Sequence, residues 1–558
     1  DVNGDGLSDI IVRKASESPE TSPVIVGSTY VIYGTANQAG STISLGKNTI
    51  SGASGFVIKS SDRYDYGGTP STDLTTRFVG DVNGDGYGDL IVSTPAHNWY
   101  PNNYPATYGE GRAYVVFGKA DNAAVDLIEV ASGKGGFALN PEIETNGMFG
   151  SAAAALGDIN GDGLADFAVG ATGKDQNGIY NTGRAYVVFG KSDGAAINMA
   201  SLTSGTSTQG FAILAENVQQ AQMGYFMDGA GDINGDGMGD LVVATPFIDA
   251  NGKAGAGRCY VVYGKADGAT VDLAAIVSGN DNLGFVINGA NAGDVAGYGG
   301  ARAAGDLNGD GFDDLLVGAS RADVGALVDA GKAYVLFGGQ QFATTVDFLG
   351  DASANTLTGT SAAETFVGGD GNDNLIGGGG SDVMMGGRGD DTFVVDGSTI
   401  TALASGLGVA GNMGQLAHIN GGTGIDTLRL SGGANLDLSA ISNTLIGSRL
   451  ESIERIDMAT DAAANVLTIQ LKDVIDMSGM NLFNQANVTG GTYLFGVIEA
   501  RHQVLIDGTS ADSVNASGFV DTHQTAIING HTYGVYNQGV AAQLLIDLAI
   551  VNANHVVL

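Results

Sequence analysis

Short apolar runs bounded by glycine recur through the first 345 residues of the chain. They are rich in β-branched and aromatic residues, as at 186–190 and 241–243. Runs of four to six residues with this composition predict β-strands rather than helices. Four such runs occur in each repeat of the pattern. Four strands per repeat, joined by loops, predict the blades of a β-propeller.

A polar string punctuates these runs at regular intervals. Asp-x-Asn-Gly-Asp-Gly-x-x-Asp occurs five times, at 1–9, 81–89, 158–166, 232–240 and 306–314. Successive copies start 80, 77, 74 and 74 residues apart, and an apolar run follows each copy directly. A near-constant period of this kind indicates one structural unit repeated along the chain.

The whole repeat resembles a known family. The order Phe-Gly, polar string, apolar run and then Gly-Arg-Ala-Tyr-Val-Val-Phe-Gly, the last at 183–190, is similar to the FG-GAP repeat of integrin α-subunit propellers. The resemblance covers residues 1–345 and implies an all-β fold that begins with an FG-GAP propeller. Such propellers typically have seven blades. We therefore expect the five visible repeats to be part of a seven-bladed propeller that is N-terminally incomplete.

The chemistry of the polar string favours calcium. Aspartate and asparagine at alternating positions place oxygen atoms on one side of a tight loop, and the glycines permit the positive φ angles that the turn needs. Calcium accepts six to eight hard oxygen ligands with flexible geometry, whereas magnesium demands a stricter octahedron. The predicted ligands occupy positions one, three, five and nine of each copy: Asp1, Asn3, Asp5, Asp9, Asp81, Asn83, Asp85, Asp89, Asp158, Asn160, Asp162, Asp166, Asp232, Asn234, Asp236, Asp240, Asp306, Asn308, Asp310 and Asp314.

Two other interpretations of the loops are weaker. An Asx turn or an Asp-Gly hairpin with solvated carboxylates would explain one copy, but five aligned copies favour calcium. An EF-hand is disfavoured because Val92 stands at position twelve, where that motif has glutamate, and because the flanks are strands. Extracellular calcium modules bind with dissociation constants of about 10⁻⁴–10⁻³ M. The ions are therefore expected to be structural.

At 346–400 the period changes to nine residues. Consecutive units occupy 368–376, 377–385 and 386–394. They resemble the RTX repeat, which winds a parallel β-roll with calcium between its turns. The resemblance implies that Asp373, Asp382 and Asp391 are ligands, while an apolar residue two positions further on points into the roll. A flexible glycine linker is the alternative, but it does not explain the in-phase apolar residues.

Residues 401–558 form a β-rich C-terminal region with one further RTX-like turn at 421–428. The stretch 531–547 is similar to the C-terminal ends of RTX proteins exported by type I secretion. That resemblance implies an uncleaved secretion signal and an extracellular location. It also implies a chain that folds only where calcium is abundant, because unpaired carboxylates repel one another until metal arrives.

Composition narrows the possible partners. Aspartate and glutamate outnumber lysine and arginine by 60 to 24, giving a formal charge of -36. Nucleic acid is excluded as an expected partner because phosphate binding needs positive charge. The single cysteine, Cys259, rules out an internal disulfide and is expected to be a buried small residue. No apolar run reaches the roughly 18 residues needed to span a bilayer, so no transmembrane segment is expected.

Enzyme motifs are missing from the sequence. It contains no Gly-x-Ser-x-Gly elbow, His-Glu-x-x-His pair or P-loop. His523 and His531 are expected to decorate loops. The cell-attachment tripeptide Arg388-Gly389-Asp390 lies inside a roll turn, so coincidence is favoured. An aromatic insertion at 99–108 suits either ligand recognition or gap filling.

These features predict a secreted, non-enzymatic adhesin or matrix protein whose propeller binds a cell-surface glycan or protein. Two alternatives stay open. One is a self-assembling surface-layer or filament subunit, which would associate with its own copies. The other is the C-terminal part of a secreted hydrolase with its catalytic domain upstream. Fold analogy alone does not choose among them.

Overall fold

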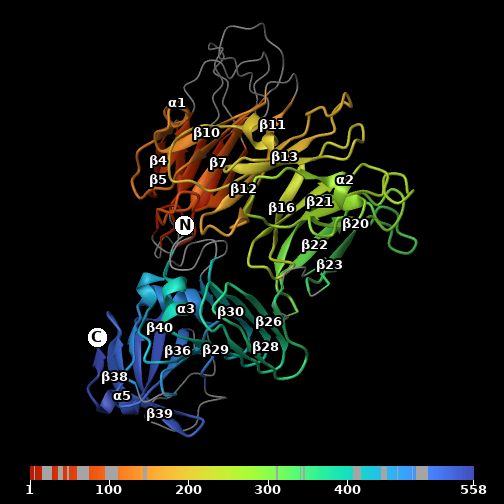
Figure 1. Ribbon diagram of the computed structural model, residues 1–558. Helices are drawn as coiled ribbons and strands as arrows, with labels where there is room; N and C mark the ends of the chain where they lie inside the picture. Colours follow the sequence, from red (N-terminus) through yellow and green to blue (C-terminus); the bar gives the residue numbers. More distant parts are fainter. Residues whose placement is uncertain are drawn as a thin grey trace.

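The computed structural model describes residues 1–4, 7–14, 28–35, 42–46, 49–59, 75–94, 111–142, 147–308, 312–339, 341–342, 346–405, 416–441, 449–460, 463–479, 482–484 and 501–558. Its sheets form two parts, a set of propeller blades and a coil of parallel strands that leads to the C-terminus (Figure 1). The predicted all-β fold, a propeller followed by a parallel β-roll, is confirmed.

Each complete repeat folds as one four-stranded antiparallel blade. The second blade contains β6 (Thr75–Gly80), β7 (Asp89–Thr94), β8 (Arg112–Val116) and β10 (Gly136–Asn140). The third contains β11 (Phe149–Gly157), β12 (Asp166–Ala171), β13 (Arg184–Val188) and β15 (Gly210–Leu214). The fourth contains β16 (Phe226–Gly231), β17 (Asp240–Thr245), β18 (Arg258–Val262) and β20 (Gly284–Asn288). Each polar string therefore connects the first and second strands of its blade.

The first and fifth blades are described with three strands of their own repeat. The first has β1 (Ile10–Lys14), β2 (Ser28–Ile32) and β5 (Gly55–Lys59), and a hairpin of β3 (Ser44–Gly46) and β4 (Thr49–Ser51) lies between the last two. The fifth has β21 (Ala296–Gly305), β22 (Asp314–Ala319) and β23 (Lys332–Leu336).

A short strap joins neighbouring blades. A two-residue strand follows the third strand of each of these blades and pairs in parallel with the fourth strand of the preceding blade. A short helix comes directly after it. The straps are β9 (Val125–Asp126) with α1 (Leu127–Ala131), β14 (Ile197–Asn198) with η1 (Met199–Ser204), and β19 (Val271–Asp272) with α2 (Leu273–Val277). Apolar side chains from facing blades form one shared core per interface, as where Ile91 and Val115 meet Phe149 and Phe167.

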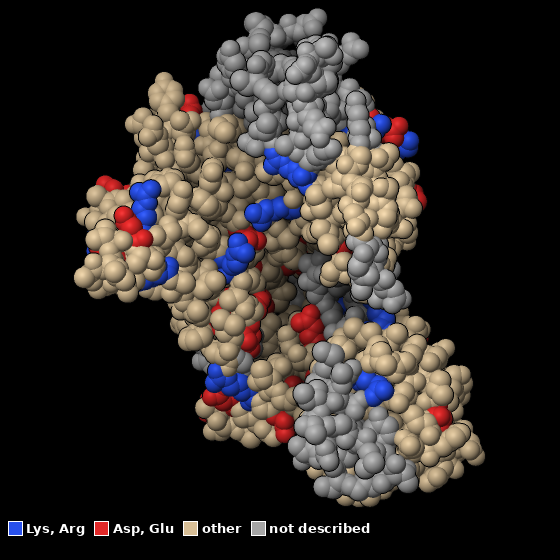
Figure 2. All heavy atoms as spheres, turned by 180° about the vertical axis from the view of Figure 1, so that it is seen from behind, with Lys and Arg blue, Asp and Glu red and all other residues tan. Residues whose placement is uncertain are grey.

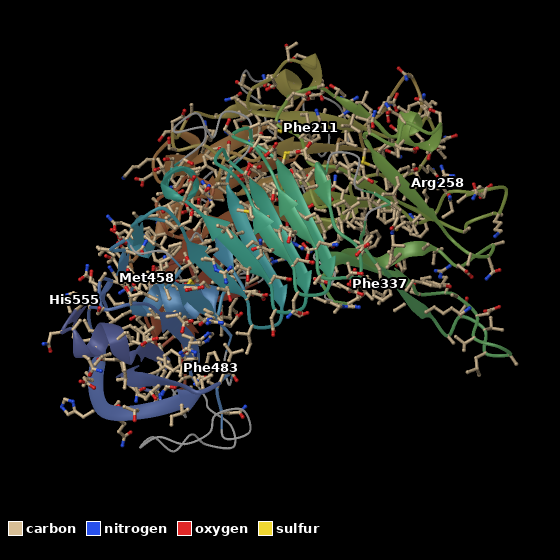
Figure 3. The ribbon with its side chains drawn as sticks, turned by 60° about the horizontal axis from the view of Figure 1, so that its bottom comes forward. Phe211, Arg258, Phe337, Met458, Phe483 and His555 are labelled. Atoms are coloured by element: carbon tan, nitrogen blue, oxygen red, sulfur yellow. The ribbon has the colours of Figure 1, made fainter. Side chains whose placement is uncertain are left out.

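The fifth blade has an open face among the described residues. Val335 and Phe337 are 45% and 50% exposed, whereas their equivalents in the fourth blade, Val261 and Tyr263, are buried by the next blade (Figure 3). The apolar pattern of the repeat is thus the same in every blade, and burial depends on whether another blade follows.

The second part, the roll domain (346–558), is a coil of stacked parallel strands. One sheet contains β24 (Phe348–Leu349), β26 (Thr365–Asp370), β28 (Val383–Arg388), β30 (His418–Thr423) and β33 (Leu450–Glu451). The facing sheet runs through β25 (Thr356–Thr358), β27 (Asn374–Ile376), β29 (Thr392–Val395), β31 (Thr427–Leu430), β34 (Arg455–Asp457) and β36 (His502–Asp507). It ends with β40 (Ala542–Asp547), β39 (His531–Gln538) and β38 (Val520–Ile528).

A third sheet and several short helices complete the roll domain. The sheet contains β32 (Leu436–Asp437), β35 (Val466–Thr468), β37 (Ser513–Asn515) and β41 (Val556–Val557). The helices are α3 (Gly397–Leu403), η2 (Leu438–Ala440), α4 (Leu471–Met477) and α5 (Leu548–Asn552). As predicted, Leu375, Met384 and Phe393 are fully buried inside the roll.

The coil does not stop at residue 400, where the sequence suggested a boundary. Strand β30 pairs with β28, and β31 pairs with β29, so the single turn at 421–428 stacks directly on the turn at 386–394. The stretch between the two turns contains α3 and leaves the stacking intact. The three nonapeptide units and most of the C-terminal region therefore share one core.

Candidate metal centres

The propeller loops wrap around their first aspartate. In the second loop, Asp81 Oδ1 accepts the amides of Gly84 and Asp85 at 2.7 and 3.1 Å, and Oδ2 accepts the amide of Gly86 at 2.8 Å. Gly84 and Gly86 have φ angles of +74° and +86°, which glycine adopts without strain. Asp158 and Asp232 make the same contacts in the third and fourth loops.

The ninth-position aspartate joins the loop to the rest of its blade. Asp166 Oδ2 accepts the amide of Ile159 at 2.8 Å, and Oδ1 accepts the amide of Gly190, just beyond β13, at 2.7 Å. Asp9, Asp89, Asp240 and Asp314 repeat this pair of bonds in the other blades. The sequence predicted these residues only as ligands, and the structure gives them a second role as a latch between loop and strand.

Burial and neighbouring negative charge make the loops unfavourable for isolated carboxylates. Burial, with a smaller contribution from Asp81, raises the pKa of Asp89 to about 8. Burial and the charge of Asp162 raise the pKa of Asp158 to about 6. The pKa values of Asp232 and Asp240 are also raised by burial and by nearby aspartates. A divalent cation would relieve this repulsion.

The acidic side chains of the described propeller loops do not form a metal cluster. Among the described residues, no group of three or more His, Cys, Asp or Glu side chains is arranged to hold a metal. The carboxylates instead face the amides of their own loop. Asp5 and Asp310 lie outside the described residues. Hard oxygen donors at every ligand position fit calcium chemically, and ligation by the propeller loops stays a prediction.

In the roll, a different feature favours cation binding, namely buried carboxylate oxygens without hydrogen-bond partners. One carboxylate oxygen of each predicted roll ligand is buried and has no hydrogen-bond partner: Asp373 Oδ2, Asp382 Oδ2 and Asp391 Oδ2. An unpaired buried carboxylate oxygen is costly. The pKa values of Asp382 and Asp391 are raised to about 7, first by burial and then by neighbouring acidic groups. These residues therefore fit a bound cation.

Sequence reasoning missed one member of this set. Asp426 Oδ2 is likewise buried without a partner, and burial raises the pKa of Asp426 to about 8. The turn Gly421-Gly422-Thr423-Gly424-Ile425-Asp426 matches the nonapeptide pattern, so the match could have identified this aspartate. Its place beside the other turns could not be read from the sequence, because α3 and its flanking residues separate them.

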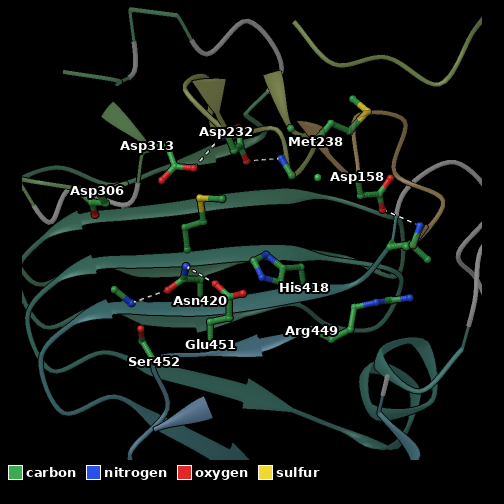
Figure 4. A pocket seen from close by; sticks show the side chains of 18 of the residues that line it. Asp158, Asp232, Met238, Asp306, Asp313, His418, Asn420, Arg449, Glu451 and Ser452 are labelled. Carbon is green, nitrogen blue, oxygen red and sulfur yellow. Dashed lines mark hydrogen bonds between the residues drawn. The ribbon is translucent and has the colours of Figure 1, made fainter. Parts of the chain in front are cut away.

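A cavity of about 510 Å³ lies between the propeller and the roll domain (Figure 4). Acidic and basic side chains both lie around the hollow between the two parts (Figure 2). The carboxylates that line it are Asp158, Asp232, Asp306, Asp313 and Glu451. Arg449 lines the roll side of the cavity with Glu451, and its guanidinium donates to the carbonyl oxygens of Ala417 and Ser405 at 3.0 and 3.2 Å. The third, fourth and fifth propeller loops thus face the roll.

Three other features singled out in the sequence are the cysteine, the cell-attachment tripeptide and the aromatic insertion. Burial raises the pKa of the Cys259 thiol to about 12, in keeping with a buried small residue. Arg388 pairs with Asp370 of the adjacent turn at 3.5 Å, and Asp390 Oδ1 accepts the amide of Ile425, so the tripeptide belongs to the stacked turns. The aromatic insertion at 99–108 lies outside the described residues.

Both repeat types are found by comparison with known families. The RTX calcium-binding nonapeptide repeat, in four copies, matches residues 358–393. The FG-GAP repeat matches residues 78–116, 149–188 and 298–336. The chain therefore contains FG-GAP repeats and calcium-binding RTX repeats, two types that are typical of extracellular proteins.

Similar curated proteins share only a part of the chain. It is 31% identical over 173 residues to phosphatidylinositol-glycan-specific phospholipase D of Bos taurus, which covers 31% of this chain and 18% of that protein. It is 28% identical over 172 residues to integrin alpha-PS2 of Drosophila melanogaster, covering 30% of this chain and 11% of that protein. Integrin alpha-E of Homo sapiens is 31% identical over 170 residues, covering 30% of this chain and 12% of that protein.

Proposed function

We propose that the protein is a secreted, calcium-dependent adhesin without enzymatic activity. The observation that carries the proposal is the union of integrin-like FG-GAP repeats and calcium-binding RTX repeats in one chain. Integrin α-subunits support a protein ligand for the propeller. No helix among the described residues is long and apolar enough to cross a membrane.

Calcium has a structural role in this proposal. Buried, unpartnered carboxylate oxygens in the roll and closely spaced aspartates in the propeller loops both favour a state with bound cations. Low calcium would keep these groups apart, and millimolar calcium outside the cell would bring them together. The C-terminal stretch 531–547 would serve as the type I export signal.

The adhesin proposal is tested by binding of the full-length protein to a glycan array and to immobilised cell-surface proteins, in millimolar calcium and after calcium removal. The expected result is binding to at least one glycan or protein in millimolar calcium and loss of that binding after calcium removal. A triple variant, Asp85→Asn, Asp162→Asn and Asp236→Asn, should lose binding while the roll keeps its calcium. If the full-length protein binds no ligand in either state, the proposal is wrong.

A second candidate function is a role as the accessory part of a secreted hydrolase. It is favoured by the match to phosphatidylinositol-glycan-specific phospholipase D. Assay of the full-length protein for cleavage of phosphatidylinositol-glycan anchors separates the two candidates. Calcium-dependent cleavage would support the hydrolase, and binding without cleavage would support the adhesin.

A further inference from the structure

Four aromatic side chains from two neighbouring blades meet at the surface of the propeller. Tyr225 and Phe226 belong to the fourth blade, and their ring centres lie 4.7 Å apart. Tyr298 of the fifth blade lies 5.4 Å from Phe226 and 5.3 Å from Phe247, which follows β17. The angles between these ring planes are 61°, 70° and 57°, close to the edge-to-face arrangement that aromatic pairs prefer. The four rings therefore pack as one unit, the aromatic cluster (Tyr225, Phe226, Phe247, Tyr298).

Most of the aromatic cluster is open to solvent. Tyr225, Phe247 and Tyr298 are 53%, 47% and 36% exposed, whereas Phe226 packs partly against the core between the fourth and fifth blades. Within the described part of the chain, neither tyrosine hydroxyl forms a hydrogen bond, so both can bind a ligand. A contiguous exposed aromatic patch of this kind marks a binding surface.

The aromatic cluster lies at the end of the blades that is remote from the roll domain. Strand β16 begins at Phe226 and leads into the polar loop at Asp232, which lines the cavity beside the roll. A strand advances about 3.3 Å per residue, so Phe226 and Asp232 lie about 20 Å apart. Strand β17 runs back from that loop to Thr245, just before Phe247. The cluster is thus separate from the predicted calcium ligands.

An extra residue in the fifth blade shapes the surface beside Tyr298. The glycine that opens the inner strand lies nine residues before the polar string in the fifth repeat and eight before it in the third and fourth. As a result, residues 297–300 of β21 lie opposite Gly318 alone in the pairing with β22. A Cβ added at Gly299 or Gly300 would meet a single atom within 4 Å, at 3.9 and 3.6 Å. A strip of open backbone therefore follows Tyr298 directly.

A carboxylate and a guanidinium lie beside the aromatic cluster. Asp228 follows Phe226 by two residues on β16, so the two side chains share one face of the strand. Arg302 Nε of β21 lies 3.9 Å from Asp228 Oδ2, and the two side chains are 60% and 28% exposed. That distance is too long for a hydrogen bond. The guanidinium and Asp228 Oδ2 therefore stay available to a ligand.

We propose that the aromatic cluster, with Asp228 and Arg302, binds a pyranose ring of a neutral glycan. The inference rests on the proposed adhesin function and gives its propeller a glycan site. A pyranose presents C–H groups on its face and hydroxyl groups on its rim, so the face packs on an exposed aromatic ring. A carboxylate only accepts hydrogen bonds and a guanidinium only donates them, whereas a hydroxyl does both. The Asp228 and Arg302 pair therefore matches neighbouring hydroxyls on the rim of the sugar.

Charge and surface shape favour a neutral glycan over other ligands. The formal charge of -36 repels acidic polymers and anionic lipid surfaces. The exposed rings are tilted against one another, so they offer several small faces instead of one continuous apolar plane. Small aromatic faces beside a few polar groups are the lining of a site for a small polar ligand such as a sugar ring.

A glycan array tests the inference on the full-length protein in millimolar calcium. The array contains neutral glycans that end in galactose, glucose, mannose, fucose or N-acetylhexosamine, together with their sialylated and sulfated forms. The expected result is binding to a neutral glycan and weaker binding to its acidic forms. Acidic forms that bind as well as the neutral one, or binding to cell-surface proteins alone, would overturn the inference and leave the adhesin function standing. A protein that binds no ligand would overturn both.

Substitutions in the aromatic cluster test the position of the site. Tyr298→Ala and Phe247→Ala should each weaken binding of the best neutral glycan about tenfold in isothermal titration, with unchanged calcium content. Arg302→Gln leaves every ring in place and should also weaken binding, so the test holds even if an alanine variant unfolds. Tyr180→Ala is the control, because Tyr180 is 66% exposed on the third blade outside the cluster. Undiminished binding by the Tyr298, Phe247 and Arg302 variants would overturn the inference.

Discussion

The ammonium group of Lys265 lies 4.3 Å from the centre of the Phe211 ring, so it connects the fourth blade to the third. Lys191 over Phe137 at 4.8 Å repeats this contact at the preceding interface. In the fifth blade Gly339 replaces the lysine, and Phe342 instead stacks on Phe285 at 4.2 Å. A contact between the blades is therefore kept while its chemistry changes.

Lys265→Met should destabilise the propeller by at least about 1 kcal/mol, because the variant keeps the stem but loses the cation–π contact together with the ion pair to Asp267 and the hydrogen bond to the Ala269 carbonyl oxygen. Urea unfolding in saturating calcium measures the change. Lys134→Met is the control, since Lys134 pairs with Glu129 on the surface and should change the free energy of unfolding by a few tenths of a kcal/mol. Equal effects of the two substitutions would contradict the role of the ring.

Glu142→Gln should cost about 3 kcal/mol, because it breaks a partly buried charge cluster. Glu142 Oε1 accepts from Arg184 at 2.7 Å and from Tyr186 at 2.6 Å, and Lys174 lies 3.1 Å from Oε2. Burial opposes ionisation, but the Tyr186 hydrogen bond and the two cations hold the pKa of Glu142 below its ordinary value. Its contribution should be complete above the ordinary glutamate pKa and should fall as pH drops through the lowered value. Thermal unfolding between pH 3 and 7 checks the sign.

Comparing Asp162→Asn with Asp166→Asn should distinguish calcium binding by the loop from the latch that joins the loop to its blade. Among the described residues, the hydrogen bonds of the Asp162 carboxylate stay within its own loop, whereas both oxygens of Asp166 accept buried backbone amides. Asp166→Asn should therefore cost about 1–3 kcal/mol with or without calcium. Asp162→Asn should weaken calcium affinity and should not lower the calcium-free stability, because it removes a negative charge that disfavours ionisation of Asp158. Calorimetric calcium titration and urea unfolding distinguish the two effects, and an Asp166→Asn protein of normal calcium-free stability would refute the latch.

Without calcium, the roll should be most stable in mild acid. The pKa values of Asp382, Asp391 and Asp426 are raised by burial to about 7, 7 and 8, well above the value of about 4 for an unfolded aspartate. The stability of the protonated folded state is full near pH 4 and is lost as pH rises through these values. Melting curves in calcium-free buffer at pH 4.5, 6 and 8 should show this fall, and saturating calcium should remove it. A calcium-free roll that is most stable at pH 8 would contradict the prediction.

Phe312→Ala should release the roll from the propeller. Phe312 is 2% exposed and packs against Val367, Val383 and Met385 of the roll, so truncation should cost about 3–5 kcal/mol. A larger radius of gyration in small-angle X-ray scattering is the expected result. Tyr87→Ala is the control, because Tyr87 holds the same position in the second loop and lies over Gly4 instead of the roll. An unchanged radius in Phe312→Ala would show that other contacts hold the two parts together.

The repeats made much of the fold readable from the sequence. Short-range patterns predicted the strands around Leu241 and Tyr260, the loops between strands and the inward position of Met384. They could do so because each repeat contains its own turns and its own apolar face. The resemblance to the RTX repeat predicted Asp373, Asp382 and Asp391 as roll ligands, and their buried oxygens agree with the expected chemistry.

The sequence by itself thus determined the local units: the strands, the loops and the nonapeptide turns, whose signals lie within nine residues or one repeat. Only the tertiary structure decided the contacts between units. Asp166 reaches Gly190, Glu142 reaches Arg184, and Asp426 meets Glu454, pairs separated by 24, 42 and 28 residues. Stacking of blades and coils brings such pairs together, and stacking depends on the summed burial of whole faces, which a local sequence pattern does not specify.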